Sequence, residues 1–394
     1  MNPKLSSPGR WVQRPEGYRV FLPDPLPPIL HWTPALTRAL SDADLVLGRL
    51  AGEGRQLPNP HLLIRPFIRR EAVLSSRIEG TQATLGEILA SEAGALVNRS
   101  PQDLREVANY VVALEYGAKR LKTLPLSLRL VRELHEKLMT GAAPPHVTPG
   151  EFRRSQNWIG PSGCTLLNAS YVPPPPDHLL ECLGKWETFL RDRSLPPLIQ
   201  IALAHYQFEA IHPFLDGNGR VGRLLITLFL IERQILPTPL LYLSAFFEAT
   251  RREYYEGLSG VSGRGDWSAW LLYFLSGVAR QCEDALSRAE RINSLLVEWR
   301  SVAAGTSSKV PVRLLDLLAA NPFITPKNAV QQLGVAFTTV QRGINFLEKR
   351  SILQQVGDAK RDRVYCAKKI MKILEEPARL TQMARRRGRG DAFS

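Results

Sequence analysis

The chain has 394 residues, 44% of them hydrophobic and 22% charged, which excludes a wholly disordered protein and predicts about two or three globular domains. Its longest apolar runs, such as Leu224–Ile231, fall far short of the ~20 residues of a membrane helix, so no membrane association is expected. The N-terminal residues lack an apolar leader, and the four cysteines are too scattered for a zinc pattern or a disulfide framework. These features predict a protein of the reducing cytoplasm.

The net charge of +14 is concentrated near the C-terminus, where residues 301–394 hold 17 Lys and Arg against 7 Asp and Glu. A basic pole of this kind favours nucleic acid or another acidic partner. The alternative for the last residues is a solvated, solubilising tail.

The elements expected along the chain are mostly helical. Residues 1–30 are rich in Pro and Gly and predict an extended arm. Residues 150–176 combine glycines, β-forming residues and a Pro173–Pro176 run, which predicts a short hairpin or flap before a rigid proline segment. Helices are expected over residues 33–55, 61–92, 101–121, 127–139, 177–192, 197–210, 219–233, 244–258 and 266–299.

The basic C-terminal region predicts a separate module. Three short helices, over 312–320, 328–333 and 337–350, precede two strand-like runs at 352–356 and 363–366 that flank a Gly-containing turn. This pattern resembles a winged helix, with Thr338, Thr339, Gln341 and Arg342 facing outward on its third helix and Lys360, Arg361 and Arg363 on its wing. DNA is a candidate partner, but we favour dimerisation or target docking, because the third helix offers only Arg342 and small polar groups to base edges.

One stretch, His212–Arg223 (HPFLDGNGRVGR), gathers several groups that suit nucleotide chemistry. Two glycines, Gly217 and Gly219, let the backbone turn and present its N–H groups at the start of a helix, which makes an anion site. Arg220 and Arg223 are three residues apart and can both reach a polyphosphate.

Two further side chains of this stretch carry chemical roles. Asp216 stands beside the predicted phosphate site and is a candidate Mg²⁺ ligand. His212 heads the loop, where an imidazole can take a proton from an incoming hydroxyl. Each feature alone is commonly structural, but their grouping within twelve residues favours a functional site.

The stretch also resembles the signature of the Fic family, HxFx(D/E)GNGRxxR, at every specified position. The resemblance extends to the HYQFEAI segment before it, the flap ending YVPPPP, and the LYLS segment after it, and it covers about residues 10–378. It implies a mainly α protein: a Fic helical core with a small β-hairpin flap, plus a C-terminal winged-helix module. The regions it suggests are 1–100 (arm and inhibitory helix), 101–300 (catalytic core), 301–309 (linker), 310–378 (module) and 379–394 (basic tail).

The activity implied by the resemblance is transfer of AMP from ATP, with Mg²⁺, to a Ser, Thr or Tyr hydroxyl of a target protein. His212 would be the general base, and Phe214 would face the core and hold the loop. The flap near Trp158–Gly163 would pin the target backbone. The ATP-binding residues would be Glu79, His212, Gly217, Asn218, Gly219, Arg220, Val221, Gly222, Arg223, Tyr254 and Tyr255, with Asp216 as the metal ligand; for the two tyrosines, simple core packing is an equal alternative.

A second motif lies upstream, in the sequence Ser75-Ser76-Arg77-Ile78-Glu79-Gly80. By composition it is an ordinary helix end with a glycine stop, but it resembles the Fic inhibitory motif (S/T)xxxE(G/N) at Ser75, Glu79 and Gly80. The implied role is that Glu79 pairs with Arg223 and takes the place of the ATP γ-phosphate, which misaligns the α-phosphate for in-line attack.

The sequence therefore favours an autoinhibited protein adenylyltransferase, with a homodimer as a further expectation. One alternative is a nucleotide-sensing, DNA-binding transcription regulator. Another is a Fic enzyme that mainly removes AMP or that transfers a different phosphate-containing group.

Overall fold

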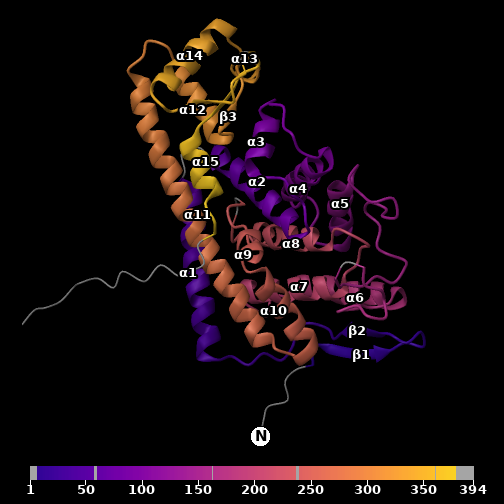
Figure 1. Ribbon diagram of the computed structural model, residues 1–394. Coiled ribbons are helices and arrows are strands. Elements are labelled where there is room, and N and C mark those ends of the chain that lie inside the picture. The colour runs from indigo at the N-terminus through magenta and orange to yellow at the C-terminus, as the bar shows by residue number, and fades with distance from the viewer. Residues whose placement is uncertain (1–6, 57–59, 162, 237–238, 360, 379–394) are drawn as a thin grey trace, which may run out of the picture.

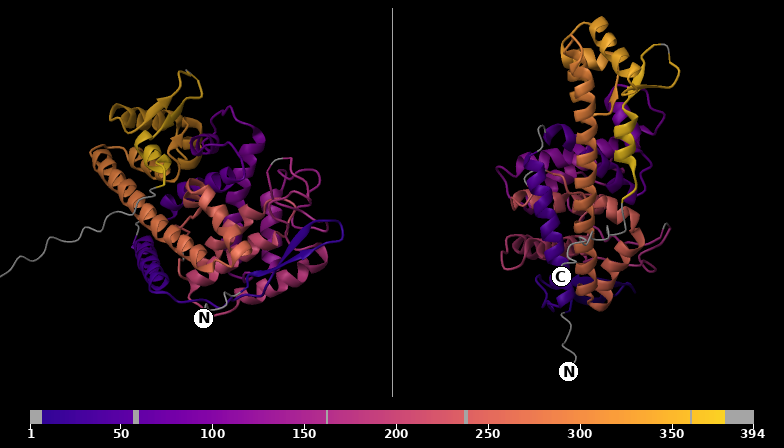
Figure 2. Two further views of the ribbon diagram at one scale, coloured as in Figure 1. Left: turned by 60° about the horizontal axis from the view of Figure 1, so that its bottom comes forward. Right: turned by 90° about the vertical axis from the view of Figure 1, so that its left-hand side faces the viewer.

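A 38-residue helix, α11 (Trp267–Ala304), runs along one side of the molecule and links the helical core to the C-terminal region (Figure 1). The computed structural model describes residues 7–56, 60–161, 163–236, 239–359 and 361–378. Helix α1 (Pro34–Gln56) packs along α11, and both views of Figure 2 show the two side by side. None of the described helices combines the length and the apolar character needed to cross a bilayer.

The predicted mainly helical fold is confirmed. Around α11 the core consists of α2 (Pro60–Ile78), α3 (Leu85–Glu92), α4 (Pro101–Arg120), α5 (Leu128–Met139), α6 (Pro176–Leu190), α7 (Pro197–Ile211), α8 (Asn218–Glu232), α9 (Ser244–Ala249) and α10 (Arg251–Arg264).

Two helices expected as single elements are broken in the structure. Residues 61–92 divide into α2 and α3, because Gly80 adopts a φ of +108°, and Thr84 then caps α3 by accepting a hydrogen bond from the Glu87 amide. Residues 244–258 divide into α9 and α10 at Thr250, whose φ of −120° and ψ of 41° are not helical. The first break places the end of α2 beside the predicted site.

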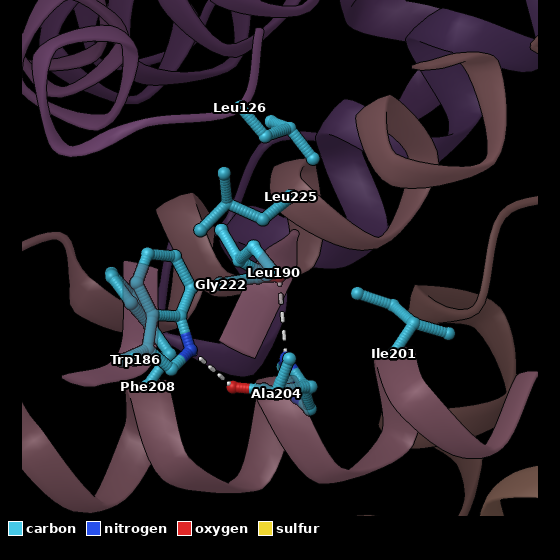
Figure 3. A pocket seen from close by; sticks show the side chains of 9 residues that line it. Leu126, Trp186, Leu190, Ile201, Ala204, Phe208, Gly222 and Leu225 are labelled. Carbon is cyan, nitrogen blue, oxygen red and sulfur yellow. Dashed lines mark hydrogen bonds between the residues drawn. The ribbon is translucent and has the colours of Figure 1, made fainter. Parts of the chain in front are cut away.

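Close packing of α6, α7 and α8 fixes the loop that carries the predicted signature. Thirteen residues of α7 are buried, and only an apolar void of about 10 Å³ remains between the three helices (Figure 3). The Trp186 indole donates to the carbonyl of Ala204 at 2.9 Å, and the His205 ring contacts the carbonyl of Gly222 at 3.3 Å. The relative position of α7 and α8, and with it the connecting loop, is thereby set.

The N-terminal arm is paired rather than merely extended. Strands β1 (Gly9–Gln13) and β2 (Arg19–Pro23) form an antiparallel ribbon with Trp11 opposite Phe21. The ribbon rests on the flap: the Phe21 amide donates to the carbonyl of Val172 at 2.9 Å, and the Trp11 ring packs edge-on against Tyr171. The flap itself has one antiparallel bridge, between Ile159 and Tyr171, so its hairpin is shorter than expected.

The C-terminal module contains the three helices and the hairpin expected from the sequence. Its strands form an antiparallel sheet in the order β3-β5-β4, and the two-residue strand β3 was not expected. Its elements are α12 (Val310–Ala320), β3 (Phe323–Ile324), α13 (Pro326–Leu333), α14 (Phe337–Lys349), β4 (Gln354–Val356), β5 (Val364–Cys366) and α15 (Lys368–Glu375). The expected linker 301–309 begins inside α11, which continues to Ala304. Lys360 and the tail 379–394 lie outside the described residues.

The module is joined to α2 and α11 by a buried cluster of charges. Arg288 of α11 forms an ion pair with Asp284 at 2.7 Å and donates to the carbonyls of Ile373, Glu376 and Pro377 at the end of α15. On α2, the Arg70 guanidinium lies 3.7 Å from the same Asp284 carboxylate. Arg288 and Asp284 are only 2% and 4% exposed, so the carbonyls at the end of α15 supply hydrogen-bond acceptors to a guanidinium that the docked module shields from water.

Candidate active site

A cavity of about 950 Å³ opens between the end of α2, the flap, the start of α8 and α10. This volume falls in the range of small-molecule and cofactor sites. Its lining includes Glu79, Trp158, Ile159, Gly160, Glu209, His212, Gly219, Arg223, Tyr254 and Tyr255. The cavity brings together the two motifs that the sequence placed more than 130 residues apart.

His212 is held in a defined orientation at the end of α7. Its backbone is left-handed, with φ 49° and ψ 62°, and its carbonyl accepts hydrogen bonds from Arg153 Nε at 2.9 Å and from Asn157 Nδ2 at 3.3 Å. Ring atom Nδ1 lies 3.3 Å from the Glu209 carbonyl, which can only accept, so Nδ1 carries the hydrogen and Nε2 has a free lone pair. Burial lowers the pKa of His212 to about 4. The imidazole is therefore neutral near pH 7 and suited to act as a base.

The loop after His212 is held by its own side chains. Asn218 donates to the Phe214 carbonyl and accepts from the Phe214 amide, both at 2.8 Å, and Phe214 is fully buried. The side chain of Asn218 thus stabilises the loop, so any contribution of Asn218 to an anion site must come from its backbone. Gly217, with φ +80°, starts α8, and the first amides of a helix have no intrahelical acceptor.

A histidine that the sequence did not single out supports the loop from α5. His135 accepts the Gly150 amide on Nδ1 at 2.8 Å, so Nε2 carries the hydrogen and donates to the Asp216 carbonyl at 3.1 Å. Its ring stacks on Phe214, with centroids 3.7 Å apart and planes 5° apart. Burial lowers the pKa of His135 to about 4, so these roles are kept near neutral pH.

Glu79 and Arg223 form a close ion pair inside the cavity, which we call the Glu79–Arg223 clamp. Arg223 Nη2 donates to Glu79 Oε1 at 2.6 Å, and the same guanidinium donates to Ser75 Oγ at 2.8 Å and to the Ser75 carbonyl at 2.9 Å. A Cβ on Gly219 would collide with Glu79 Oε1. The carboxylate therefore rests against the N-terminus of α8, where an anion is favoured.

The clamp lowers the pKa of Glu79. Burial of Glu79 acts to raise its pKa, but the charge and hydrogen bond of Arg223 outweigh that effect. Glu79 is therefore ionised at neutral pH, and its side chain keeps 35% exposure, so a ligand can approach it.

Arg220 lies one turn before Arg223 on α8, but its closest ionic contacts are with other residues than those of the clamp. It is 4% exposed, and its guanidinium lies 3.5 Å from Glu106 and 3.6 Å from Asp216. Arg220 and Arg223 therefore contact different elements, rather than forming one exposed pair.

Asp216 is the remaining candidate metal ligand. It accepts the Gly217 amide at 2.6 Å and is 43% exposed. Across the described ranges no three His, Cys, Asp or Glu side chains gather into a metal site. Asp216 is not part of the cavity lining, but an exposed carboxylate next to the N-terminus of α8 fits Mg²⁺, which typically takes one or two carboxylates together with phosphate oxygens.

The other predicted site residues divide into two groups. Tyr254 and Tyr255 both line the cavity: Tyr255 is 43% exposed, whereas Tyr254 is 1% exposed and contacts His205 through its hydroxyl at 2.9 Å. The Val221 side chain is in the core, and Gly222 faces α7.

Sequence reasoning missed several groups that position the site. Besides His135, Arg153 and Asn157 hold the His212 carbonyl. The buried Glu71 of α2 accepts hydrogen bonds from Tyr110 of α4 and Ser244 of α9. Each is a lone polar residue in a helix or loop, without a spacing that marks it. Only the folded contacts reveal them.

The fold and the cavity together define a helical protein that can bind a polyanion beside a neutral histidine. Residues 37–119 match the Fic/DOC family N-terminal domain, and residues 125–230 match the Fic/DOC family domain. Residues 37–230 of the chain thus carry a Fic family N-terminal domain followed by a Fic domain.

Curated relatives share part of their length with this chain. Protein adenylyltransferase Fic of Drosophila grimshawi is 32% identical over 161 residues, which are 39% of this chain and 31% of that protein. Protein adenylyltransferase fic-1 of Caenorhabditis briggsae is 30% identical over 219 residues, 54% of this chain and 39% of that protein. The chain thus covers between about three and four tenths of these relatives.

The fold also has a relative among solved structures. A Fic family protein from Desulfovibrio desulfuricans G20 superposes with a TM-score of 0.58, over 87% of this chain and 98% of that chain. At 21% identity this likeness concerns the fold alone.

Proposed function

We propose that this chain is a protein adenylyltransferase, which transfers AMP from ATP to a hydroxyl side chain of a target protein. One observation carries the proposal: His212, neutral and with Nε2 free, lines the same cavity as the start of α8 and Arg223. The matched relatives named protein adenylyltransferases support the same activity.

The chemistry follows from this arrangement. The target hydroxyl oxygen attacks the α-phosphorus of ATP, the α–β phosphoanhydride bond breaks, and pyrophosphate leaves. The hydroxyl proton passes to His212 Nε2, whose Nδ1–H stays on the Glu209 carbonyl. The product is an AMP ester on the target side chain.

The chain's other residues would bind and orient the triphosphate. The first amides of α8 would hold phosphate oxygens, and Arg223 would hold the γ-phosphate once Glu79 leaves it. Mg²⁺, held by Asp216, would neutralise charge on the phosphates. The Asp216 carbonyl is fixed by His135, which keeps the loop in place.

The Glu79–Arg223 clamp supports autoinhibition as part of this proposal. As long as Glu79 occupies Arg223, the γ-phosphate has no cationic partner there, and ATP must bind in a less productive pose. We therefore propose a low basal activity, with Ser75 and Gly80 positioning the inhibitory glutamate.

The direct test is incubation of the purified chain with ATP labelled at the α-phosphate. We expect label on the protein itself or on a protein of a cell lysate, and no label with His212→Ala. Label from the γ-phosphate, or none from either position even with Glu79→Gly, would contradict the proposal.

The labelling assay does not address the remaining functional predictions. A cytoplasmic location, a homodimer and a winged-helix role for the C-terminal module stay predictions. DNA binding also stays a prediction. We do not favour it, because the exposed residues of α14 that could meet base edges are Arg342 and small polar side chains such as Thr338. A chain that mainly removes AMP would release AMP from a modified target in the α-label assay.

A further inference from the structure

Glu209, on α7 one turn before His212, is a carboxylate that the fold leaves without a partner. Its Oε1 atom is buried and has no hydrogen-bond partner within the described part of the chain. Burial raises the pKa of Glu209 to about 7, although Arg223 acts to lower it. A buried carboxyl group without a partner costs free energy of folding, and such groups concentrate where a ligand binds.

The surrounding residues make room for this carboxylate instead of pairing with it. A Cβ on Gly222 would collide with Glu209 Oε1, so only glycine fits there while Glu209 keeps its place. Arg223, the nearest guanidinium in the cavity wall, is already bonded to Ser75 and Glu79. Glu256, another carboxylate of the cavity, has its own partner in Arg252 at 3.1 Å.

A second polar atom without a partner lies one turn away. Tyr206 precedes Glu209 by three residues on α7, so the two side chains share a face of the helix. Both line the cavity, and the Tyr206 hydroxyl, which lies near the Ser262 side chain, makes no hydrogen bond of full geometry among the residues that the structure covers. The floor of the cavity thus offers a carboxylate acceptor and a hydroxyl together.

The position of Glu209 in the cavity points to the part of a nucleotide that it meets. Its charge acts on Arg223 at the phosphate end and on Tyr254 at the aromatic end. Beside Tyr254, Tyr255 presents an exposed ring on which a base can stack. In a nucleoside triphosphate the ribose lies between phosphates and base, and Glu209 lines the same cavity as Arg223 and the two tyrosines.

We propose that Glu209, with Tyr206, binds the 2′- and 3′-hydroxyls of the donor nucleotide and makes the site selective for ribonucleotides. The inference rests on the proposed nucleotide site but adds a selectivity that the phosphate contacts do not supply. Glu209 accepts hydrogen bonds from the ribose hydroxyls, as carboxylates do in other nucleotide sites. Tyr206 lines the same part of the cavity and helps to position the ribose.

The test compares ATP with 2′,3′-dideoxy-ATP, using calorimetric dissociation constants for the full-length chain. We expect the wild type to bind ATP roughly tenfold or more tightly than the dideoxy analogue, as the loss of hydrogen bonds to a charged group implies. Glu209→Leu should bring the two constants within about twofold of each other by weakening ATP alone. Tyr206→Phe should reduce the ratio in the same direction, and Glu256→Gln, as the matched control, should leave it at the wild-type value.

The outcomes separate this inference from the proposed function. A wild-type ratio near one, or a ratio that Glu209→Leu and Tyr206→Phe both leave unchanged, would overturn the ribose assignment. Equal weakening of both nucleotides by Glu209→Leu would also overturn it, because that pattern means a structural effect. An intact ratio in a protein that transfers no AMP would instead contradict the proposed function and leave the ribose site standing.

Discussion

The Glu79–Arg223 clamp gives a sharp prediction for the variant Glu79→Gly. In the proposed mechanism, ATP binds productively when its γ-phosphate replaces Glu79 at Arg223. The free energy needed to break the Glu79–Arg223 ion pair therefore weakens productive binding by the same amount. A hydrogen bond between charged groups contributes about 1.5–3 kcal/mol. Since the Glu79 side chain is 35% exposed, solvent screening favours the lower part of this range, about 1.5–2 kcal/mol.

That free energy corresponds to about a ten- to thirtyfold gain in productive occupancy. We therefore expect Glu79→Gly to raise AMP incorporation about ten- to thirtyfold at subsaturating ATP, measured by label from the α-phosphate. Adding Arg223→Ala should remove the gain, since the freed guanidinium is its cause. Glu92→Gln is the matched control, because Glu92 pairs with Arg69 at 3.0 Å with similar exposure, 37%, outside the cavity. Equal activity of Glu79→Gly and wild type would refute the inhibitory role.

Further predictions concern protonation and the supports of the site. His212, whose pKa burial lowers to about 4, must be neutral to accept a proton. In the Glu209→Leu variant, which lacks the cavity carboxyl with a pKa of about 7, activity should therefore stay level from pH 8 down to about pH 5 and fall only below; a fall with an apparent pKa near 6.5 in that variant would contradict the assignment of His212. Replacing His135 by Phe keeps the stacking on Phe214 but leaves the Gly150 amide and the Asp216 carbonyl unpaired, and denaturant titration should show a loss of about 1–3 kcal/mol per group. Arg288→Met leaves Asp284 buried without its main partner and should cost about 3–5 kcal/mol in thermal unfolding; an unchanged melting temperature would show that the charge cluster does not hold α15.

Stability should also depend on pH through the buried histidines. Burial lowers the pKa of His205 to about 3 and of His135 to about 4, below the unfolded value near 6.5. At these two histidines the unfolded chain therefore binds more protons below pH 6.5. In the Glu209→Leu variant, which removes the opposing carboxyl whose pKa burial raises to about 7, the free energy of unfolding falls as the pH drops from 6.5 toward 5. Each histidine contributes at most about 1.4 kcal/mol per pH unit. Unfolding curves that coincide at pH 7 and pH 5 would contradict this.

Much of the helical frame could be predicted from the sequence, because apolar periodicity and helix-stop residues mark most of its elements. The bounds expected for 101–121 and 127–139 agree closely with α4 and α5. The break at Thr250 was missed, whereas Gly80 was recognised as a helix stop even though the expected helical range 61–92 ran across it. Strand β3 was also missed, because two residues carry no periodicity.

The candidate site was predictable only where its residues are contiguous. The loop from His212 to Arg223 carries a dense motif, so the sequence alone points to this loop as part of a nucleotide site. His135, Arg153 and Asn157 act through single contacts to backbone carbonyls, which leave no spacing in the sequence. Likewise, Glu209 reads as one polar residue of an apolar helix, and only its missing partner and the collision with a Cβ on Gly222 draw attention to it.

The central claim is that this cavity transfers AMP with His212 as base, and intact-protein mass spectrometry after incubation with ATP and Mg²⁺ tests it most directly. For Glu79→Gly, alone or with lysate proteins, the account predicts a mass increase of one AMP group on a Ser, Thr or Tyr side chain. Glu79→Gly combined with His212→Ala should show no such increase while still binding ATP. An AMP adduct formed equally well without His212, or no adduct on any protein with His212 intact, would contradict the account.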